Sequence, residues 1–333
     1  MRLVMMGTGT FAEPTLEALL AGPDPVVGVF TQPDREGVQR RGSTRQVGRG
    51  IKEIAAERGV PVFQPASVNA PDGVAMLRGL SPDLLVVAAY GQILSKEVLS
   101  IPTQAAINVH GSLLPKYRGA APVAWAILNG ETETGVTIIR MTAGLDAGDM
   151  LMKASLSITN ETAGELEAKL APLGARLAVE TVQRMKAGPV KGEKQDPSQV
   201  TKAPKLTKEM GLIDWTQSAA RVCRQVRAMQ PWPTAYTYLH RAAKEPMRVI
   251  INSVVEFPVR CDPALQPGTP FVDRYTAPGK SLFVAVAEVL PGEERGVVEV
   301  LELQPAGKKR MTAEEFLRGH PLKDGDRFGP EAG

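Results

Sequence analysis

Short apolar runs and amphipathic segments alternate along the first 187 residues of the chain. The apolar runs predict strands, several of them buried on both faces, at residues 2–6, 25–30, 83–89, 105–110 and 135–140. Helical patterns lie between them at residues 11–21, 48–59 and 121–130. This alternation predicts an α/β fold with a doubly wound, mostly parallel sheet.

A longer amphipathic pattern follows the last predicted strand and closes a first domain, residues 1–187. Its apolar positions recur at the spacing of one helix face: Leu166, Leu170, Leu173, Leu177 and Val182. Pro172 lies inside this pattern and predicts a kink or the start of a second helix.

The segment 188–208 breaks the periodicity. It is rich in Pro, Gly, Lys and polar residues, which predicts a linker. Beyond it, residues 218–229 have a helical pattern, and Gly and Pro turns separate apolar runs at 247–257, 281–289 and 296–303. We therefore expect a second domain, residues 209–333, that contains a small antiparallel barrel.

Composition and charge exclude several classes of protein. The apolar runs are far shorter than the roughly 18 residues that a membrane span needs, and no signal-peptide pattern precedes the first glycines. The two cysteines, Cys223 and Cys261, have no metal-type spacing and are expected to be reduced. We expect a cytoplasmic protein without a metal or a membrane partner. The net charge of +3 does not by itself argue for nucleic acid.

The first glycine cluster, GTGTFA at residues 7–12, fits the Gly-x-Gly-x-x-Gly/Ala dinucleotide fingerprint. A nicotinamide site should also offer an acidic residue at the end of the second strand. Here that strand runs into Thr31, Gln32 and Pro33, and Asp34 comes only after the turn. A tight strand-to-helix turn therefore explains the cluster better than a nicotinamide site.

The stretch INVHGSLLPKYRGAAP, residues 107–122, ends a buried strand with two polar side chains. Asn108 and His110 are two positions apart, so they point to the same face of the strand. His110 falls at the carboxyl end of the strand, where open α/β sheets bind their ligands. Asp146 lies in a glycine-containing loop after the next predicted strand, and we expect the adjacent strand ends to bring it to His110.

These three residue types suit transfer of a group between two bound substrates. An amide and an imidazole can stabilise an oxyanion, and a carboxylate can orient and charge the imidazole. Ser112 follows His110 too closely for an ordinary nucleophilic triad. The alternative for Asp146 is a loop or capping residue, and a lone histidine such as His110 is often structural.

Together with GVTIIRMTAGLDAGD (135–149), the same stretch resembles the signature of the formyltransferases that use 10-formyltetrahydrofolate. Further motifs resemble the members that act on methionyl initiator tRNA: TQPD (31–34), VFQPAS (62–67), AAYGQILS (88–95), LIDW (212–215), QPWPTAY (230–236) and LQPAGKKRMTAEEFLRG (303–319). The resemblance covers nearly the whole chain.

The resemblance implies a Rossmann-like catalytic domain, a linker and an OB-like barrel that helps to bind tRNA. We also expect a monomer. The resemblance implies catalytic roles for Asn108, His110 and Asp146, with no metal. It also implies 10-formyltetrahydrofolate as the formyl donor. The folate contacts would come from Ser112, Leu113, Leu114 and Pro115.

Basic residues of the loop 35–52 and of the helix 218–229 are the predicted tRNA contacts: Arg40, Arg41, Arg45, Arg49, Arg221 and Arg224. The chain departs from the family at Gly9, where proline is usual, and in the loop, which keeps its basic character but not the usual motif. Solvated surface is the alternative for these residues.

Other functions stay open at this point. A formyltransferase acting on a small amine, such as glycinamide ribonucleotide or an amino sugar, would share Asn108, His110 and Asp146 but not need the second domain. A nicotinamide-dependent oxidoreductase would use GTGTFA. A tRNA-binding protein without catalysis would not need the three polar residues.

Overall fold

The fold comes from a computed structural model, whose described residues are 1–34, 50–262, 264–272, 281–290 and 294–331. The chain forms two compact units. The first comprises residues 1–126, 131–159 and 164–205, and the second comprises 127–130, 160–163 and 206–333.

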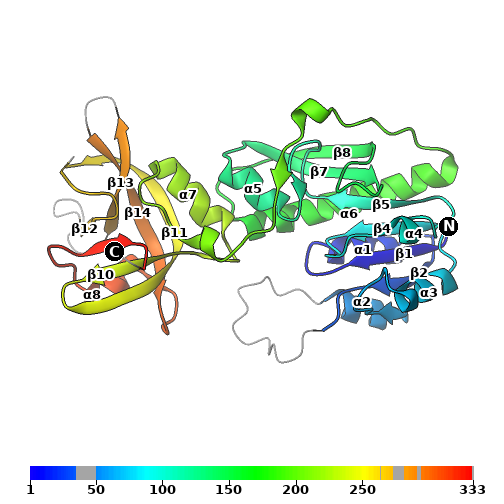
Figure 1. Ribbon diagram of the computed structural model, residues 1–333, viewed down its shortest axis with the longest axis horizontal. Helices are drawn as coiled ribbons and strands as arrows, with labels where there is room; N and C mark the ends of the chain where they lie inside the picture. Colours follow the sequence, from blue (N-terminus) through cyan, green and yellow to red (C-terminus); the bar gives the residue numbers. More distant parts are fainter. Residues whose placement is uncertain (35–49, 263, 273–280, 291–293, 332–333) are drawn as a thin grey trace. The chain divides into compact units, whose positions relative to one another are not determined.

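A seven-stranded sheet with the order β3-β2-β1-β4-β5-β7-β8 forms the centre of the first unit (Figure 1). Its strands are β1 (Leu3–Gly7), β2 (Val26–Phe30), β3 (Val62–Phe63), β4 (Leu84–Ala88), β5 (Ala105–His110), β7 (Glu133–Arg140) and β8 (Met150–Ser157). The first five strands pair in parallel, whereas β7 and β8 are antiparallel to their neighbours. The predicted doubly wound, mostly parallel sheet is confirmed.

Helices cover both faces of this sheet. They are α1 (Glu13–Leu20), α2 (Ile51–Glu57), α3 (Pro71–Gly79), α4 (Lys96–Leu99), α5 (Pro122–Leu128, whose last two residues belong to the second unit) and α6 (Ala163–Ala187). On one face, α1 and α6 meet beside Leu3. On the other face, residues of α3 and α4 pack with Val4 and Met6 in a buried apolar cluster. Alternate residues of β1 thus pack into the core on opposite faces of the sheet.

The helix α6 continues through Pro172 without interruption, so the suggested second helix starting at that proline is wrong. Two residues further on, Gly174 lies directly over the sheet. A Cβ atom at this position would come 2.6 Å from a methyl carbon of Val109 and 3.5 Å from one of Val136. The missing side chain lets the α6 backbone approach β5 closely, one residue before His110.

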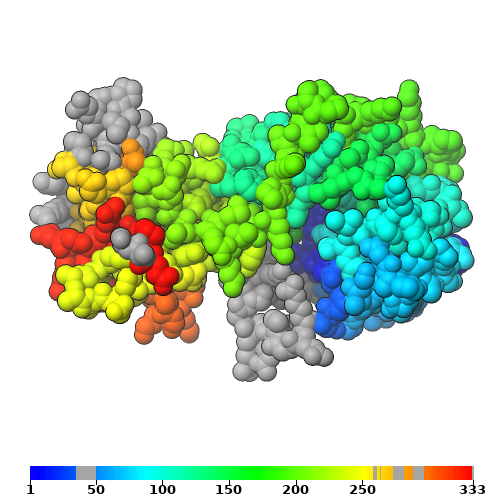
Figure 2. All heavy atoms as spheres, in the orientation of Figure 1, coloured from blue at the N-terminus to red at the C-terminus, as the bar shows by residue number. Residues whose placement is uncertain are grey.

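The predicted linker segment packs against the first unit as far as Lys205 (Figure 2). It contains η1 (Pro197–Gln199) and β9 (Lys202–Ala203), which pairs in parallel with the short strand β6 (Arg118–Gly119). Earlier in the segment, Glu193 forms an isolated bridge with Met150. The composition of this segment does not predict these contacts, because they are made mostly by backbone groups. That it acts as a linker between domains stays a prediction.

The second unit is built on a curled antiparallel sheet with the order β12-β13-β14-β11-β10-β16, to which β15 is added beside β14. Its elements are η2 (Glu209–Gly211), α7 (Ala219–Ala228), β10 (Ala235–Arg241), β11 (Lys244–Cys261), β12 (Pro270–Val272), β13 (Leu282–Leu290), β14 (Glu294–Pro305), β15 (Met311–Thr312), α8 (Ala313–Gly319) and β16 (Arg327–Gly329). The register between β11 and β14 shifts three times, which is how bulges bend long strands. The predicted OB-like barrel is confirmed as a half-barrel.

Candidate functional site

The strand order of the first unit reverses between β1 and β4, and ligands of open α/β sheets bind at the carboxyl ends of such strands. The loops that follow these two strands are tied together there. The hydroxyl of Thr8 donates to the carbonyl oxygen of Tyr90 at 3.4 Å, and the Gln32 amide, in the loop after β2, donates to the same oxygen at 3.0 Å. The strand β5 lies beside β4, so His110 ends at the same edge of the sheet.

The glycine cluster after β1 forms the tight turn that its spacing predicts. A Cβ atom on Gly7 would lie 2.6 Å from the Cβ of Ala12, and Gly9 has a φ of +75°, which favours glycine. Proline, with its φ fixed near −65°, would not fit this conformation. The helix α1 then begins at Glu13.

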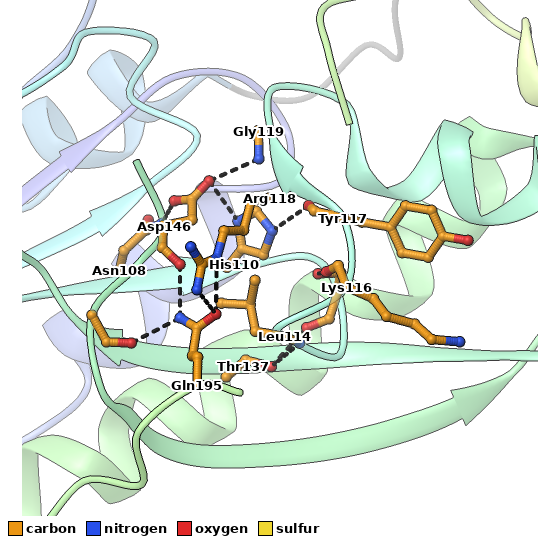
Figure 3. Close-up of polar contacts among 12 residues, drawn as sticks. Asn108, His110, Leu114, Lys116, Tyr117, Arg118, Gly119, Thr137, Asp146 and Gln195 are labelled. Carbon is orange, nitrogen blue, oxygen red and sulfur yellow. Dashed lines mark hydrogen bonds and ion pairs between the residues drawn. The ribbon is translucent and has the colours of Figure 1, made fainter. Parts of the chain in front are cut away.

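Asn108, His110 and Asp146 lie together at the carboxyl end of β5 (Figure 3). The Asn108 amide nitrogen is 3.4 Å from Asp146 Oδ1, and His110 Nδ1 is 3.6 Å from Asp146 Oδ2. The side chains of His110 and Asp146 are only 5% and 11% exposed. A carboxylate with so little contact with water interacts more strongly with neighbouring donors than an exposed one.

Asp146 reaches His110 by a route different from the one we expected. Because β7 is antiparallel to β5, Arg140 at its carboxyl end pairs with Ile107 rather than with the end of β5. The loop after β7 then returns toward Asn108 and His110. Asp146 has a φ of +47° in this loop, a left-handed conformation that few residues other than glycine adopt. The expected contact between Asp146 and His110 therefore forms, but through the returning loop after β7 and not through adjacent strand ends.

Both ring nitrogens of His110 face oxygen acceptors. Nδ1 points to the Asp146 carboxylate, and Nε2 is 2.9 Å from the carbonyl oxygen of Tyr117. An imidazolium, which carries a hydrogen on each nitrogen, satisfies both contacts at once. Donation from Nε2 to a substrate oxygen requires that the bond to Tyr117 be exchanged, whereas the positive charge acts without any such change.

The Asp146 carboxylate also accepts a hydrogen bond from a backbone group. The N–H of Gly119 donates to Oδ2 at 2.9 Å, so this oxygen lies between Gly119 and His110. The Asn108 amide has a second N–H donor that its contact with Asp146 does not use. The cluster thus combines a fixed carboxylate, an imidazole ring that faces it, and an amide donor.

Of the predicted folate contacts, two are enclosed by the protein. Ser112 is fully buried and its hydroxyl donates to the carbonyl oxygen of Lys116 at 2.7 Å. Leu114 is 2% exposed, and its N–H donates to the hydroxyl of Thr137 at 3.1 Å. Leu113 and Pro115 are half-buried and keep some surface. These two residues are the better placed of the four to touch a ligand.

The Tyr117 backbone that receives His110 Nε2 is itself held on both sides. Its N–H donates to the hydroxyl of Thr201 at 2.8 Å, and its phenol donates to Glu131 at 2.8 Å. Partial burial raises the pKa of Glu131, but hydrogen bonds from Tyr117 and Lys116 outweigh burial and keep the pKa below its ordinary value. Glu131 therefore stays ionised and anchors Tyr117.

The predicted tRNA contacts are placed unevenly. The loop residues Arg40, Arg41, Arg45 and Arg49 lie outside the described residues. In the second unit, the guanidinium of Arg221 donates to the carbonyl oxygen of Leu128, and burial lowers its pKa. The guanidinium of Arg224 lies close to Gly130. Both helix arginines are half-buried, so they are not the fully solvated surface that was the alternative to a tRNA contact.

Two classes of site were searched for in the described part of the chain. Among these residues, no group of three or more His, Cys, Asp and Glu side chains is arranged to hold a metal ion. None of the described helices is both long and apolar enough to cross a membrane.

The sequence did not point to Gln195, Tyr117 or Gly119, which complete the surroundings of the trio. Tyr117 and Gly119 act through backbone groups, so their side chains carry no signal. Gln195 lies in the segment without periodicity, and its amide donates to the carbonyl oxygens of Asp146 and Gly148. The position of Gln195 beside Asp146 becomes apparent only in the fold, where this segment returns to β6.

The chain matches two domain families along its length. Residues 1–182 match the formyl transferase family, and residues 205–321 match the formyl transferase C-terminal domain family. A methionyl-tRNA formyltransferase of Geobacter metallireducens is 42% identical over 98% of both chains. One from Geobacter sulfurreducens is 43% identical over all of this chain and 98% of its own.

Solved structures share the fold at low sequence identity. An N-formyltransferase from Helicobacter canadensis, in complex with folinic acid and dTDP-3-aminofucose, has a TM-score of 0.62 and 16% identity. The match covers 89% of this chain and 97% of that chain. HypX from Aquifex aeolicus in complex with tetrahydrofolic acid has a TM-score of 0.59 and 16% identity, over 95% of this chain and 46% of that chain. With both domain families and relatives matched along its length, this chain belongs to the formyltransferase family, among the methionyl-tRNA formyltransferases.

Proposed function

We propose that this chain transfers the formyl group of 10-formyltetrahydrofolate to the α-amino group of methionyl initiator tRNA. The proposal is supported by relatives of that name, which match the chain from end to end. The observation that carries the chemistry is the contact of Asp146 with both Asn108 and His110 at the carboxyl end of β5. An amide, a charged ring and a carboxylate suit acyl transfer between two bound substrates.

The reaction makes one bond, breaks one bond and moves one proton. The neutral α-amine of methionine attacks the formyl carbon, the bond from that carbon to the folate nitrogen breaks, and the amine proton goes to that nitrogen through a water molecule. Asn108 donates to the formyl oxygen as negative charge develops on it, and His110 adds positive charge. Asp146 orients the ring. Loss of one such oxyanion donor costs about 3 to 4 kcal/mol of barrier.

Exposed or half-buried apolar side chains in the loops after β4, β5 and β7 suit a flat, largely aromatic formyl donor. Ile93, in the loop after β4, is 73% exposed, and Leu145, which precedes Asp146, is 60% exposed. Leu113 and Pro115 add half-buried apolar surface beside the end of β5. A solved structure with the same fold holds tetrahydrofolic acid. Folate supplies the formyl group as a co-substrate, and the side chains of this chain bind and orient it.

The tRNA contacts and two further properties stay predictions. Phosphate contacts by Arg40, Arg41, Arg45 and Arg49 of the loop, and by Arg221 and Arg224 of α7, belong to the proposal, as do a monomer and a cytoplasmic location. The low net charge of +3 favours local basic clusters over a general attraction for RNA. Sedimentation of the purified chain, with and without tRNA, checks the monomer.

An acceptor panel tests the proposed function. The full chain is incubated with 10-formyltetrahydrofolate and, separately, methionyl initiator tRNA, glycinamide ribonucleotide and a nucleotide-linked amino sugar. We expect formylation of the tRNA at least 100-fold faster than of either small amine. Faster formylation of a small amine would replace the proposal by its nearest rival, and activity that depends on NAD would favour an oxidoreductase.

A further inference from the structure

Gln195 is almost completely enclosed, although it lies in a segment whose composition predicts a linker. The residue is 9% exposed, and its side chain lies beside the loop that carries Asp146 (Figure 3). The residue falls between the two matched domain families, which end at residue 182 and resume at residue 205. Gln195 itself therefore belongs to neither matched range, although its hydrogen-bond partners lie in the first one.

The amide of Gln195 uses both its oxygen and its nitrogen. The oxygen accepts from Arg118 Nε at 3.0 Å and from Arg118 Nη2 at 2.7 Å. The nitrogen donates to the carbonyl oxygen of Asp146 at 2.7 Å and to that of Gly148 at 2.8 Å. Two accepted and two donated hydrogen bonds fill the capacity of one amide group, so its orientation is fixed by its surroundings.

These four bonds hold both sides of the Asp146 carboxylate. On one side, the carbonyls of residues 146 and 148 fix the backbone from which the carboxylate projects, where Asp146 has its left-handed φ of +47°. On the other side, Arg118 precedes Gly119, whose N–H donates to the carboxylate at 2.9 Å. The short pairing of β6 with β9 brings Arg118 beside Lys202, in the same segment as Gln195.

We propose that Gln195 is a positioning residue for formyl transfer: it sets the Asp146 carboxylate against His110 and Asn108. This inference rests on the proposed function. The segment 188–205 then completes the catalytic site instead of only connecting two domains. Gln195 acts through Asp146 and touches neither substrate, so its loss should slow the chemical step and leave tRNA binding unchanged.

Two substitutions remove hydrogen bonds of Gln195 in different ways. Gln195→Ala deletes all four hydrogen bonds. Gln195→Glu keeps the volume and the pairing with Arg118, but turns an acceptor toward the two loop carbonyls, which lose their donor. Gln199→Ala is the matched control, because Gln199 lies in the same segment, is exposed and donates to Asp196 at 2.9 Å. Circular dichroism and thermal unfolding of the full-length variants establish that each one folds.

The test is a double-mutant cycle in kcat for formylation of methionyl initiator tRNA. We expect Gln195→Ala and Gln195→Glu each to lower kcat by roughly 10- to 100-fold, with the KM for tRNA within about twofold of the parent. In a chain that already carries Asp146→Asn, the same changes should lower kcat by less than about threefold, because the group that Gln195 positions has lost its charge.

Two results would overturn the inference while the parent chain formylates tRNA normally. One is a kcat for both Gln195 variants equal to that of Gln199→Ala. The other is the same loss with and without Asp146→Asn, which would indicate a general structural role. A parent chain that formylates no tRNA would instead refute the proposed function itself, and the inference with it.

Discussion

Replacing Asp146 by asparagine removes one negative charge from the site and replaces one carboxylate oxygen by an NH2 donor. The asparagine carbonyl can still accept from the N–H of Gly119, as Oδ2 of the carboxylate does at 2.9 Å. Its NH2 group then faces the amide nitrogen of Asn108, where Oδ1 stood at 3.4 Å. Two donors now oppose each other, so the Asn108 amide must turn, and His110 Nδ1 no longer faces a negative charge.

The size of the effect follows from the distance between the two charged groups. Unit charges 3.6 Å apart, the separation of His110 Nδ1 and Asp146 Oδ2, attract each other by about 4 to 5 kcal/mol at an effective dielectric constant near 20. Solvent relaxation makes this an upper bound. A loss of about 3 to 4 kcal/mol corresponds to a kcat roughly 100- to 1,000-fold lower, at about tenfold for each 1.4 kcal/mol.

Single-turnover formylation measures this loss directly. Enzyme in excess over methionyl initiator tRNA is mixed with 10-formyltetrahydrofolate, quenched at intervals, and the formylmethionine is counted after the ester is hydrolysed. Asp149→Asn is the matched control, because it removes the same charge three residues further along the loop and leaves the trio intact. A rate for Asp146→Asn within a few-fold of this control would refute the role given to the carboxylate.

Three further predictions concern packing and titration. Gly174→Ala puts a Cβ atom 2.6 Å from a valine carbon of β5, so we expect a net loss of about 1 to 2 kcal/mol in urea unfolding. Gly188→Ala, with no atom within 4 Å of its added carbon, should show none of this loss. Burial raises the pKa of Cys223 to about 12, so at pH 8 its thiolate fraction is about 1,000-fold lower than that of a thiol with pKa 9.0, and alkylation followed by mass spectrometry should show a correspondingly slow reaction. The hydrogen bond from the N–H of Arg2 keeps the pKa of Asp83 below 3.8, so this carboxylate contributes stability above that pH and loses it as the pH falls through the lower, folded value. Asp83→Asn should therefore lower the free energy of unfolding near pH 7, with the difference vanishing in acid.

The periodicity of the sequence predicted the elements whose burial is regular. The five strands with continuous apolar runs all appear in the sheet, because strands covered on both faces need apolar residues at every position. Asn108 and His110 share a face of β5 because side chains alternate along a strand. Short elements escaped prediction, including β3 (Val62–Phe63) and β9 (Lys202–Ala203), because two residues are too few to establish a period.

The surroundings of the trio could not be predicted from residue types. The direction of β7 decides how the loop with Asp146 reaches His110, and apolar runs carry no information about strand direction. The partners of the trio are largely backbone groups, such as the carbonyl of Tyr117 and the N–H of Gly119. Gln195 meets Asp146 only because the chain returns from α6 to β6, a long-range contact that local patterns do not reveal.

The most direct test of the proposed function follows the formyl group itself. The full chain is mixed with 10-formyltetrahydrofolate that carries an isotopic label in its formyl carbon, together with methionyl initiator tRNA. Mass spectrometry then locates the label after the methionine has been released from the tRNA. We expect one labelled formyl group on each methionine α-nitrogen, and at least 100-fold less label with His110→Ala over the same time. Label that stays on the folate, or that reaches the tRNA equally fast without His110, would contradict formyl transfer at this site.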